Sequence, residues 1–342
     1  MNNSVSLNQK KSTALTRSAF FYRDAFPAYT LTLILTTRCN FRCRHCFRDS
    51  QTPKDLSLDI IKNLLGDAQR FHFRHIALTG GEPLLYPKLE ELLEIIARNE
   101  YRFSMVTNGE LFQEWFERLL RFKASLNVIS FSLDGANKET NDSLRQAGAF
   151  EKTMKNIELC RKHKVPFRII TVINRRNFDE LSSLALLAKK KGAMMMILST
   201  ALACPRTDAN NLVLEPDKRA ELLALSQSIS KRLRFPIPVC AAILANLGAR
   251  LCQPLSLSEI AIDADGHLVC CCDLGNFDDP EIRKKSVIDS VAGMSFSQVL
   301  KNYSSFADKF CRQRIDETTR ESLTDIDFHS CFYCLRKCSG HA

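Results

Sequence analysis

Between residues 31 and 200, short apolar runs of strand length alternate with longer segments whose apolar residues recur every three or four positions. The runs are apolar on both faces, which is typical of parallel strands buried on two sides. This pattern predicts strands at 31–36, 75–79, 103–107, 127–133, 167–173 and 193–199, and helices at 56–71, 88–99, 111–122, 149–163 and 178–192. Repeated βα units with right-handed crossovers predict an α/β fold, a partial (β/α)6 parallel barrel whose functional loops follow the strand ends.

The rhythm changes after Pro205. One more helix is expected at 215–233, and from about 250 the chain becomes cysteine-rich and irregular. The Asp265-Gly266 pair between two apolar runs predicts a hairpin. We therefore expect an N-terminal extension (1–30), the barrel (31–205), a helical linker (206–250) and a small cysteine-rich α+β domain (251–342).

Composition excludes several classes of protein. The formal charge is +10, but no nucleic-acid-binding motif accompanies it. The sequence contains neither a signal peptide nor an apolar run long enough to cross a membrane. Fourteen cysteines without an export signal favour metal binding in a reducing cytoplasm over disulfides.

Three cysteines, Cys39, Cys43 and Cys46, follow the first predicted strand within eight residues. Structural zinc sites usually pair two CxxC units and close all four coordination positions. Here only three thiolates are local, so an iron–sulfur cube held by them keeps one iron open for a further ligand. An unrelated zinc knuckle is the alternative.

This CxxxCxxC spacing resembles the radical SAM superfamily, in which the open iron of a [4Fe-4S] cluster binds S-adenosylmethionine (SAM). The resemblance implies one-electron cleavage of SAM to a 5′-deoxyadenosyl radical that abstracts a substrate hydrogen. The residue before the last cysteine is usually aromatic and lies against the adenine in that family. Here it is His45, whose imidazole can also stack.

Further SAM contacts are implied by motifs at later strand ends. "TGGEP" resembles the motif that binds the SAM amino group, with Glu82 as the carboxylate and glycines that allow a close approach to the ligand. Ser132 and Asp134, at the end of the fourth strand, are candidates for the SAM ribose, as is Asn174 at the end of the fifth, and Arg145 is the candidate for the SAM carboxylate. The complete candidate set is Gly80, Gly81, Glu82, Pro83, Asn108, Ser132, Asp134, Arg145 and Asn174.

The tail resembles the twitch or SPASM extension that carries auxiliary clusters. Its implied ligands for at least one auxiliary [4Fe-4S] cluster are Cys252, Cys271, Cys331 and Cys334. The run Cys270–Cys272 leaves the register open, although the spacing from Gly266 favours Cys271. Cys338 comes at a shortened spacing, which favours a single auxiliary cluster. A second cluster using Cys311, Cys338 or His341, and zinc in place of a cluster, remain alternatives.

The resemblance implies a reductant of the flavodoxin or ferredoxin type and leaves three functions open. The first is modification of a peptide by epimerisation, crosslinking or oxidation, in which Cys204 could return a hydrogen atom to the substrate. The second is oxidation of a small alcohol by a twitch-type dehydrogenase. The third is a non-catalytic electron-transfer or binding protein.

Overall fold

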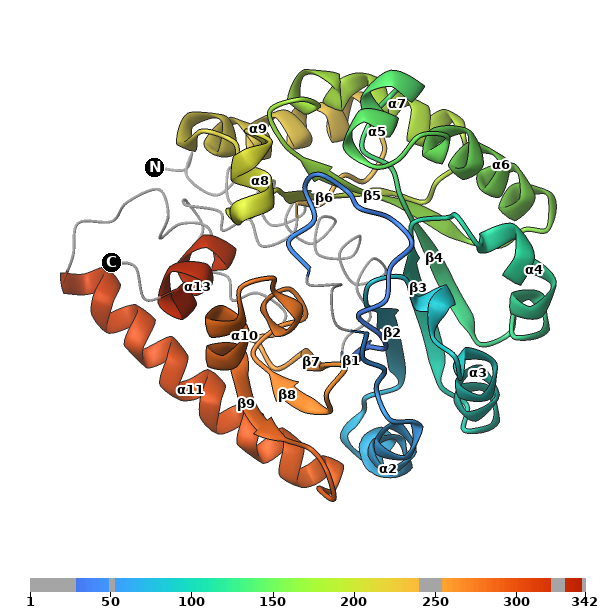
Figure 1. The fold of residues 1–342 in the computed structure, drawn as a ribbon. Helices are drawn as coiled ribbons and strands as arrows, with labels where there is room; N and C mark the ends of the chain where they lie inside the picture. The colour runs from blue at the N-terminus through green and yellow to red at the C-terminus, as the bar shows by residue number, and fades with distance from the viewer. Residues whose placement is uncertain (1–28, 49–52, 240–253, 321–329, 340–342) are drawn as a thin grey trace, which may run out of the picture.

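The computed structural model describes residues 29–48, 53–239, 254–320 and 330–339, and its centre is one curved sheet (Figure 1). Strands β1 to β6 are parallel and lie side by side in sequence order. Their bounds are β1 Thr30–Ile34, β2 His75–Thr79, β3 Arg102–Thr107, β4 Leu126–Ser132, β5 Phe167–Ile173 and β6 Met196–Thr200. The expected parallel α/β sheet is confirmed.

Helices follow the strands and cover the convex face of the sheet (Figure 1). The predicted ones are α2 Leu58–Ala68, α3 Leu89–Arg98, α4 Phe112–Arg121, α6 Ala149–Lys162 and α7 Leu181–Lys190. A short helix, α5 Lys138–Leu144, was not predicted because its sequence KETNDSL is polar. Asn137 caps it by accepting a hydrogen bond from the Thr140 amide (2.9 Å).

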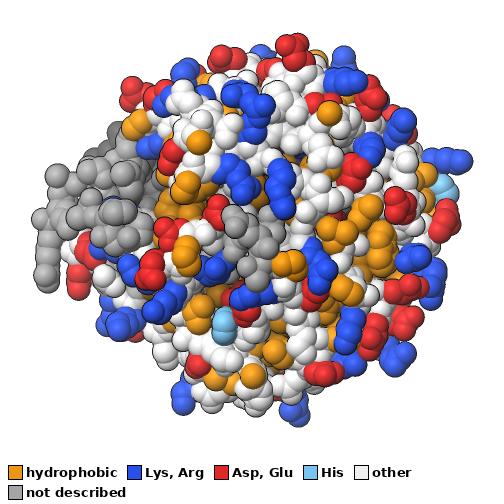
Figure 2. Space-filling model, in the orientation of Figure 1, with side chains coloured by type: hydrophobic (Ala, Val, Ile, Leu, Met, Phe, Trp, Pro, Cys, Tyr) orange, Lys and Arg blue, Asp and Glu red, His pale blue; other side chains and the backbone are white. Residues whose placement is uncertain are grey.

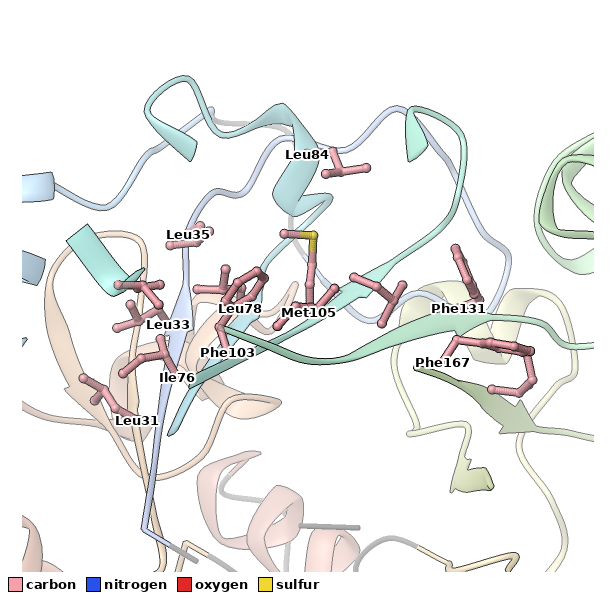
Figure 3. Packing of buried hydrophobic residues seen from close by; sticks show 14 of the residues in the cluster. Leu31, Leu33, Leu35, Ile76, Leu78, Leu84, Phe103, Met105, Phe131 and Phe167 are labelled. Atoms are coloured by element: carbon pink, nitrogen blue, oxygen red, sulfur yellow. The ribbon is translucent and has the colours of Figure 1, made fainter. Parts of the chain in front are cut away.

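Alternate side chains of each strand form the main core against these helices. Figure 3 shows them passing from one strand to the next: Leu31, Leu33 and Leu35, then Ile76 and Leu78, Phe103 and Met105, Phe131, and Phe167. The opposite face is more polar than the sequence suggested, since Thr32, Ser104 and Ser130 are buried there. The expectation of strands apolar on both faces is therefore wrong for the inner face.

The region after residue 254 extends the same sheet. Strand β7 (Glu259–Ile262) pairs in parallel with β1, and β8 (His267–Val269) and β9 (Val287–Ser290) add antiparallel strands. The predicted hairpin joins β7 to β8, with Gly266 at φ +80°. Asp263 closes the turn by accepting hydrogen bonds from the amides of Asp265 (3.0 Å) and His267 (2.7 Å).

The tail is far more regular than expected. Helix α10 (Pro280–Ser286) precedes β9, α11 (Phe296–Arg320) flanks β9 and α10 as one long helix (Figure 1), and α13 (Ser330–Ser339) carries the last cysteines. Val299, Tyr303 and Ala307 are buried along one stripe of α11. Apolar residues that recur every four positions are typical of a helix, so this part of α11 could have been predicted from the sequence.

Residues 205–239 pack onto the barrel. Helices α8 (Pro205–Ala209) and α9 (Pro216–Leu233) follow β6, and Val239 forms a parallel bridge with Leu198. Leu222 and Ile229 of α9 belong to the main core. The sheet runs from the barrel into the tail without interruption. The domain limits proposed from the sequence stay a prediction.

The surface carries both signs of charge. Figure 2 shows Lys and Arg side chains interspersed with Asp and Glu over the face presented in Figure 1. Within the described ranges, none of the helices combines the length and apolarity that a membrane span requires.

Candidate functional site

The loop after β1 gathers the first three cysteines. Cys39, Cys43 and Cys46 pack in one small cluster with Phe41 and Ala149, and the Cys46 amide donates to the Cys43 carbonyl (3.1 Å). Cys43 is buried and the other two are half-buried. The three predicted ligands therefore come together at the carboxyl end of β1.

Donor groups approach two of the three sulfurs. The Phe41 amide donates to Cys39 Sγ (3.5 Å), with Asn108 Nδ2 at 3.9 Å from the same atom, and Arg145 Nη1 lies 4.0 Å from Cys43 Sγ. Burial raises the pKa of Cys43 to about 12, although Arg145 opposes the shift. Metal binding must therefore expel protons, and the nearby donors suit thiolates that hold a cluster.

The TGGEP turn is built against this loop. The amide of Gly81 donates to Thr36 O (2.7 Å), and that of Glu82 donates to Arg38 O (2.8 Å). A Cβ on Gly81 would lie 2.1 Å from Arg38 O, and one on Gly80 would lie 2.5 Å from Thr36 O. A side chain at either glycine would therefore collide with the backbone of the cysteine loop, and the role of these glycines beside a ligand stays a prediction.

Glu82 is a buried carboxylate, 1% exposed. Its oxygens accept hydrogen bonds from Thr107 Oγ1 (2.8 Å), the Asn108 amide (2.8 Å) and the Leu84 amide (3.2 Å) that follows Pro83. Burial raises the pKa of Glu82 to about 7 against these hydrogen bonds. A ligand ammonium beside it would restore the charged form. Sequence reasoning missed Thr107, which fixes the carboxylate.

His45, Asp134 and Arg145 form one buried group. Asp134 Oδ2 lies 2.7 Å from His45 Nε2 and 2.6 Å from Arg145 Nε, and Oδ1 accepts from the Val172 amide (2.8 Å). Burial alone would raise the pKa of Asp134, but Arg145 and His45 hold it at about 2. Three residues predicted to contact different parts of SAM thus contact one another.

Three further candidates are placed less favourably. Asn174 is fully buried in its own turn, where it donates to Val172 O (2.9 Å) and accepts from the Arg176 amide (3.0 Å). Cys204 caps α8, and Thr207 Oγ1 donates to its sulfur (3.4 Å). Ser132 is half-buried at the end of β4. The roles of all three stay predictions.

The tail cysteines surround a second, apolar cluster. Cys270, Cys271, Cys331 and Cys334 border a group of buried residues: Leu202, Cys204, Leu274, Phe277, Ile282, Leu335 and Cys338. The Cys270 thiol lies beside those of Cys271 and Cys338, which together with burial raise its pKa. The ligand set predicted from the sequence contains Cys271 but not Cys270, because spacing does not show which of three adjacent side chains faces the other cysteines.

Cys272 points elsewhere. Its thiol donates to Asp273 Oδ1 (3.9 Å) and lies near Glu259 of β7, which in turn accepts from Thr32 Oγ1 of β1 (2.8 Å). Cys272 is not among the cysteines that border the apolar cluster. Cys252 lies outside the described residues.

Comparison with known proteins identifies the barrel. Residues 33–188 match the model of the Radical SAM superfamily. An AdoMet-dependent heme synthase from Methanosarcina barkeri is 36% identical over 165 residues, 47% of each chain. The mycofactocin maturase MftC of Mycolicibacterium smegmatis is 32% identical over 181 residues, 52% of this chain and 46% of that protein. The chain thus spans about half the length of the curated relatives it matches.

Two solved structures share the fold over a longer stretch. Native anSMEcpe with bound AdoMet and the Cp18Cys peptide has a TM-score of 0.66 at 18% identity. The match covers 92% of this chain and 97% of the anSMEcpe chain. Streptococcus suis SuiB bound to the precursor peptide SuiA has a TM-score of 0.60 at 13% identity, over 82% and 68%. The matched segment, residues 33–188, contains both the three-cysteine loop and the TGGEP turn. Through this segment the chain belongs to the radical SAM superfamily.

Proposed function

We propose that the protein is a radical SAM enzyme that modifies a peptide by epimerisation, crosslinking or oxidation. The observation that carries the SAM chemistry is the convergence of three thiols, Glu82 and Asn108 at one end of the sheet. Cys39, Cys43 and Cys46 would hold a [4Fe-4S] cluster, which when bound supplies one electron for the cleavage of SAM. Glu82 would receive the SAM ammonium.

The chain's own residues have three tasks. The hydrogen bonds from Gly81 and Glu82 to the loop backbone hold the cysteines in register with β2. Asn108 joins the third strand to the loop by donating to Asn40 Oδ1 (2.8 Å). Burial of Glu82 and Asp134 excludes water from the polar groups around the loop.

The peptide substrate is supported by the likeness in fold to SuiB and anSMEcpe, whose structures contain peptides. The heme synthase among the relatives favours a small molecule instead, as does the twitch-type alcohol dehydrogenase considered from the sequence. A non-catalytic iron–sulfur protein has less support, because Glu82 and its donors form a ligand site beside the cysteines.

We further propose one auxiliary [4Fe-4S] cluster in the tail, with ligands drawn from Cys270, Cys271, Cys331, Cys334 and Cys338. Their thiols meet in an apolar setting, and four thiolates close such a cluster completely. Its role is to accept an electron or to hold the substrate region together.

The test is anaerobic reconstitution with iron and sulfide, followed by reduction in the presence of SAM. Formation of 5′-deoxyadenosine supports the radical SAM assignment, and its absence from a fully loaded protein contradicts it. Product analysis with candidate peptides and small alcohols then separates the two substrate classes.

A further inference from the structure

Both oxygens of the buried Asp134 carboxylate already have partners within the protein. Oδ2 is shared between His45 Nε2 and Arg145 Nε, and Oδ1 accepts from Val172. The residue is 0% exposed. A ribose hydroxyl could reach the carboxylate only if the residues that cover it moved, so the geometry disfavours the ribose role expected from the sequence.

Asp134 is itself held firmly in place. Its amide donates to Asn141 Oδ1 (2.9 Å), and its carbonyl accepts from Asn177 Nδ2 (2.9 Å). A Cβ on the neighbouring Gly135 would lie 2.4 Å from the Asn141 amide nitrogen. The carboxylate therefore has a fixed position between α5 and β5.

Arg145 connects this carboxylate to the cysteine loop. It lies at the end of α5, its side chain is 6% exposed, and Nη1 is 4.0 Å from Cys43 Sγ. The contact with Asp134 is an ion pair without hydrogen-bond alignment. The Arg44 amide also donates to Leu144 O (2.8 Å), so the end of α5 braces the loop twice.

His45 is the second group that Asp134 holds. The ring is 6% exposed and occupies the position where the radical SAM pattern usually has an aromatic residue. A phenyl ring is positioned by packing alone, whereas His45 has a ring nitrogen that Asp134 holds by a hydrogen bond (2.7 Å).

We propose that Asp134 is a positioning residue, which orients His45 toward the SAM site and sets the charge that Arg145 presents to the Cys43 sulfur. This inference rests on the proposed cluster at Cys39, Cys43 and Cys46. Asp134 balances the Arg145 charge at the loop, so removing either partner changes the net charge beside Cys43 in opposite directions.

The experiment measures the midpoint potential of the cluster by EPR-monitored redox titration of the full chain. The signal is assigned by its change on addition of SAM. Asp134→Asn leaves the Arg145 charge unbalanced and should shift the potential upward. Arg145→Gln leaves the Asp134 charge unbalanced and should shift it downward. Glu139→Gln, an exposed carboxylate on the same helix α5, is the matched control and should leave the potential unchanged.

SAM affinity supplies the second measurement. Loss of the orienting carboxylate should raise the Kd for SAM by about 10- to 100-fold in Asp134→Asn. Arg145→Lys keeps the positive charge. It provides the test if the other variants fail to load iron. It should leave the potential close to that of the unmodified protein while SAM binding weakens.

Shifts of the same sign in the two charge variants, or no shift in loaded protein, would overturn the proposal. So would a ribose contact, detected with 2′-deoxyribose and 3′-deoxyribose analogues of SAM. If Asp134 binds one of these hydroxyls, the matching deoxy substitution and Asp134→Asn would have non-additive effects on Kd. Failure of the unmodified protein to form a SAM-responsive cluster would instead count against the proposed function.

Discussion

The two cysteine groups of this protein differ in what surrounds the sulfur atoms. Cys39, Cys43 and Cys46 lie on a single loop that is tied to β2, β3 and α5 by polar contacts, with Asn108 and Arg145 near the sulfurs. The tail cysteines come from two separate segments and meet among leucine and phenylalanine side chains. The first arrangement surrounds the sulfurs with polar and charged groups, whereas the second surrounds them with apolar side chains. The proposed open site and the proposed closed site therefore differ in their neighbours as well as in ligand number.

The largest expected effect is on the open site. Cys39→Ala, Cys43→Ala or Cys46→Ala should each reduce 5′-deoxyadenosine formation to background, because each removes one of only three protein ligands. Chromatographic quantification after reduction with dithionite measures it. Cys160→Ala, a buried cysteine of α6 in the main core, is the control and should retain activity. Activity retained by any of the three loop variants would exclude the radical SAM mechanism.

The next effect tests how the open site is held. Gly81→Ala places a Cβ 2.1 Å from Arg38 O, so the cysteine loop must move and iron binding should fall together with SAM binding. Gly66→Ala in α2 meets nothing within 4 Å and should be neutral, or stabilising by about 1 kcal/mol. Iron analysis and thermal unfolding distinguish the two variants. Full iron loading in Gly81→Ala would show that the glycine serves the ligand rather than the loop.

The closed site should respond differently. Replacing Cys271, Cys334 and Cys338 together by Ala should lower iron from about eight to about four atoms per chain and spare SAM cleavage. Cys270→Ala should also lose iron, whereas Cys272→Ala should not, because the Cys272 thiol donates to Asp273 and does not border the apolar cluster. Metal analysis decides between the outcomes. Iron near four with one zinc in the unmodified protein would mean that the tail site is a zinc site.

The smallest effect is a pH dependence at Glu82. Its pKa is raised from 4.5 to about 7, so its contribution to stability is present below pH 4.5 and lost as the pH rises through 7. An ammonium ligand needs the carboxylate, so SAM binding below pH 7 must release a proton. The Kd should therefore fall by up to about tenfold per pH unit on approaching pH 7 and then level off. Calorimetry at several pH values measures it, and Glu82→Gln should abolish the dependence.

Much of the barrel was predictable because each strand and helix carries its own periodicity. Strand β5, for example, was expected at 167–173 and observed at Phe167–Ile173. The contacts that build the site were not predictable in the same way, because they join distant residues. Nothing local to Asp134 indicates that it binds His45, 89 positions earlier. Likewise, α5 has little apolar pattern, and its position depends on contacts with the cysteine loop and β4.

The pairing of β7 with β1 has a consequence for dividing the protein. Strand β1 has β2 on one side and β7 on the other, so β7 supplies hydrogen-bonding partners that the barrel alone would lack. A fragment ending before residue 254 would leave the backbone groups of β1 unpaired along that side, as a template for another chain. The tail thus also protects the barrel against self-association, and its removal should cost solubility even if every SAM-binding residue is retained.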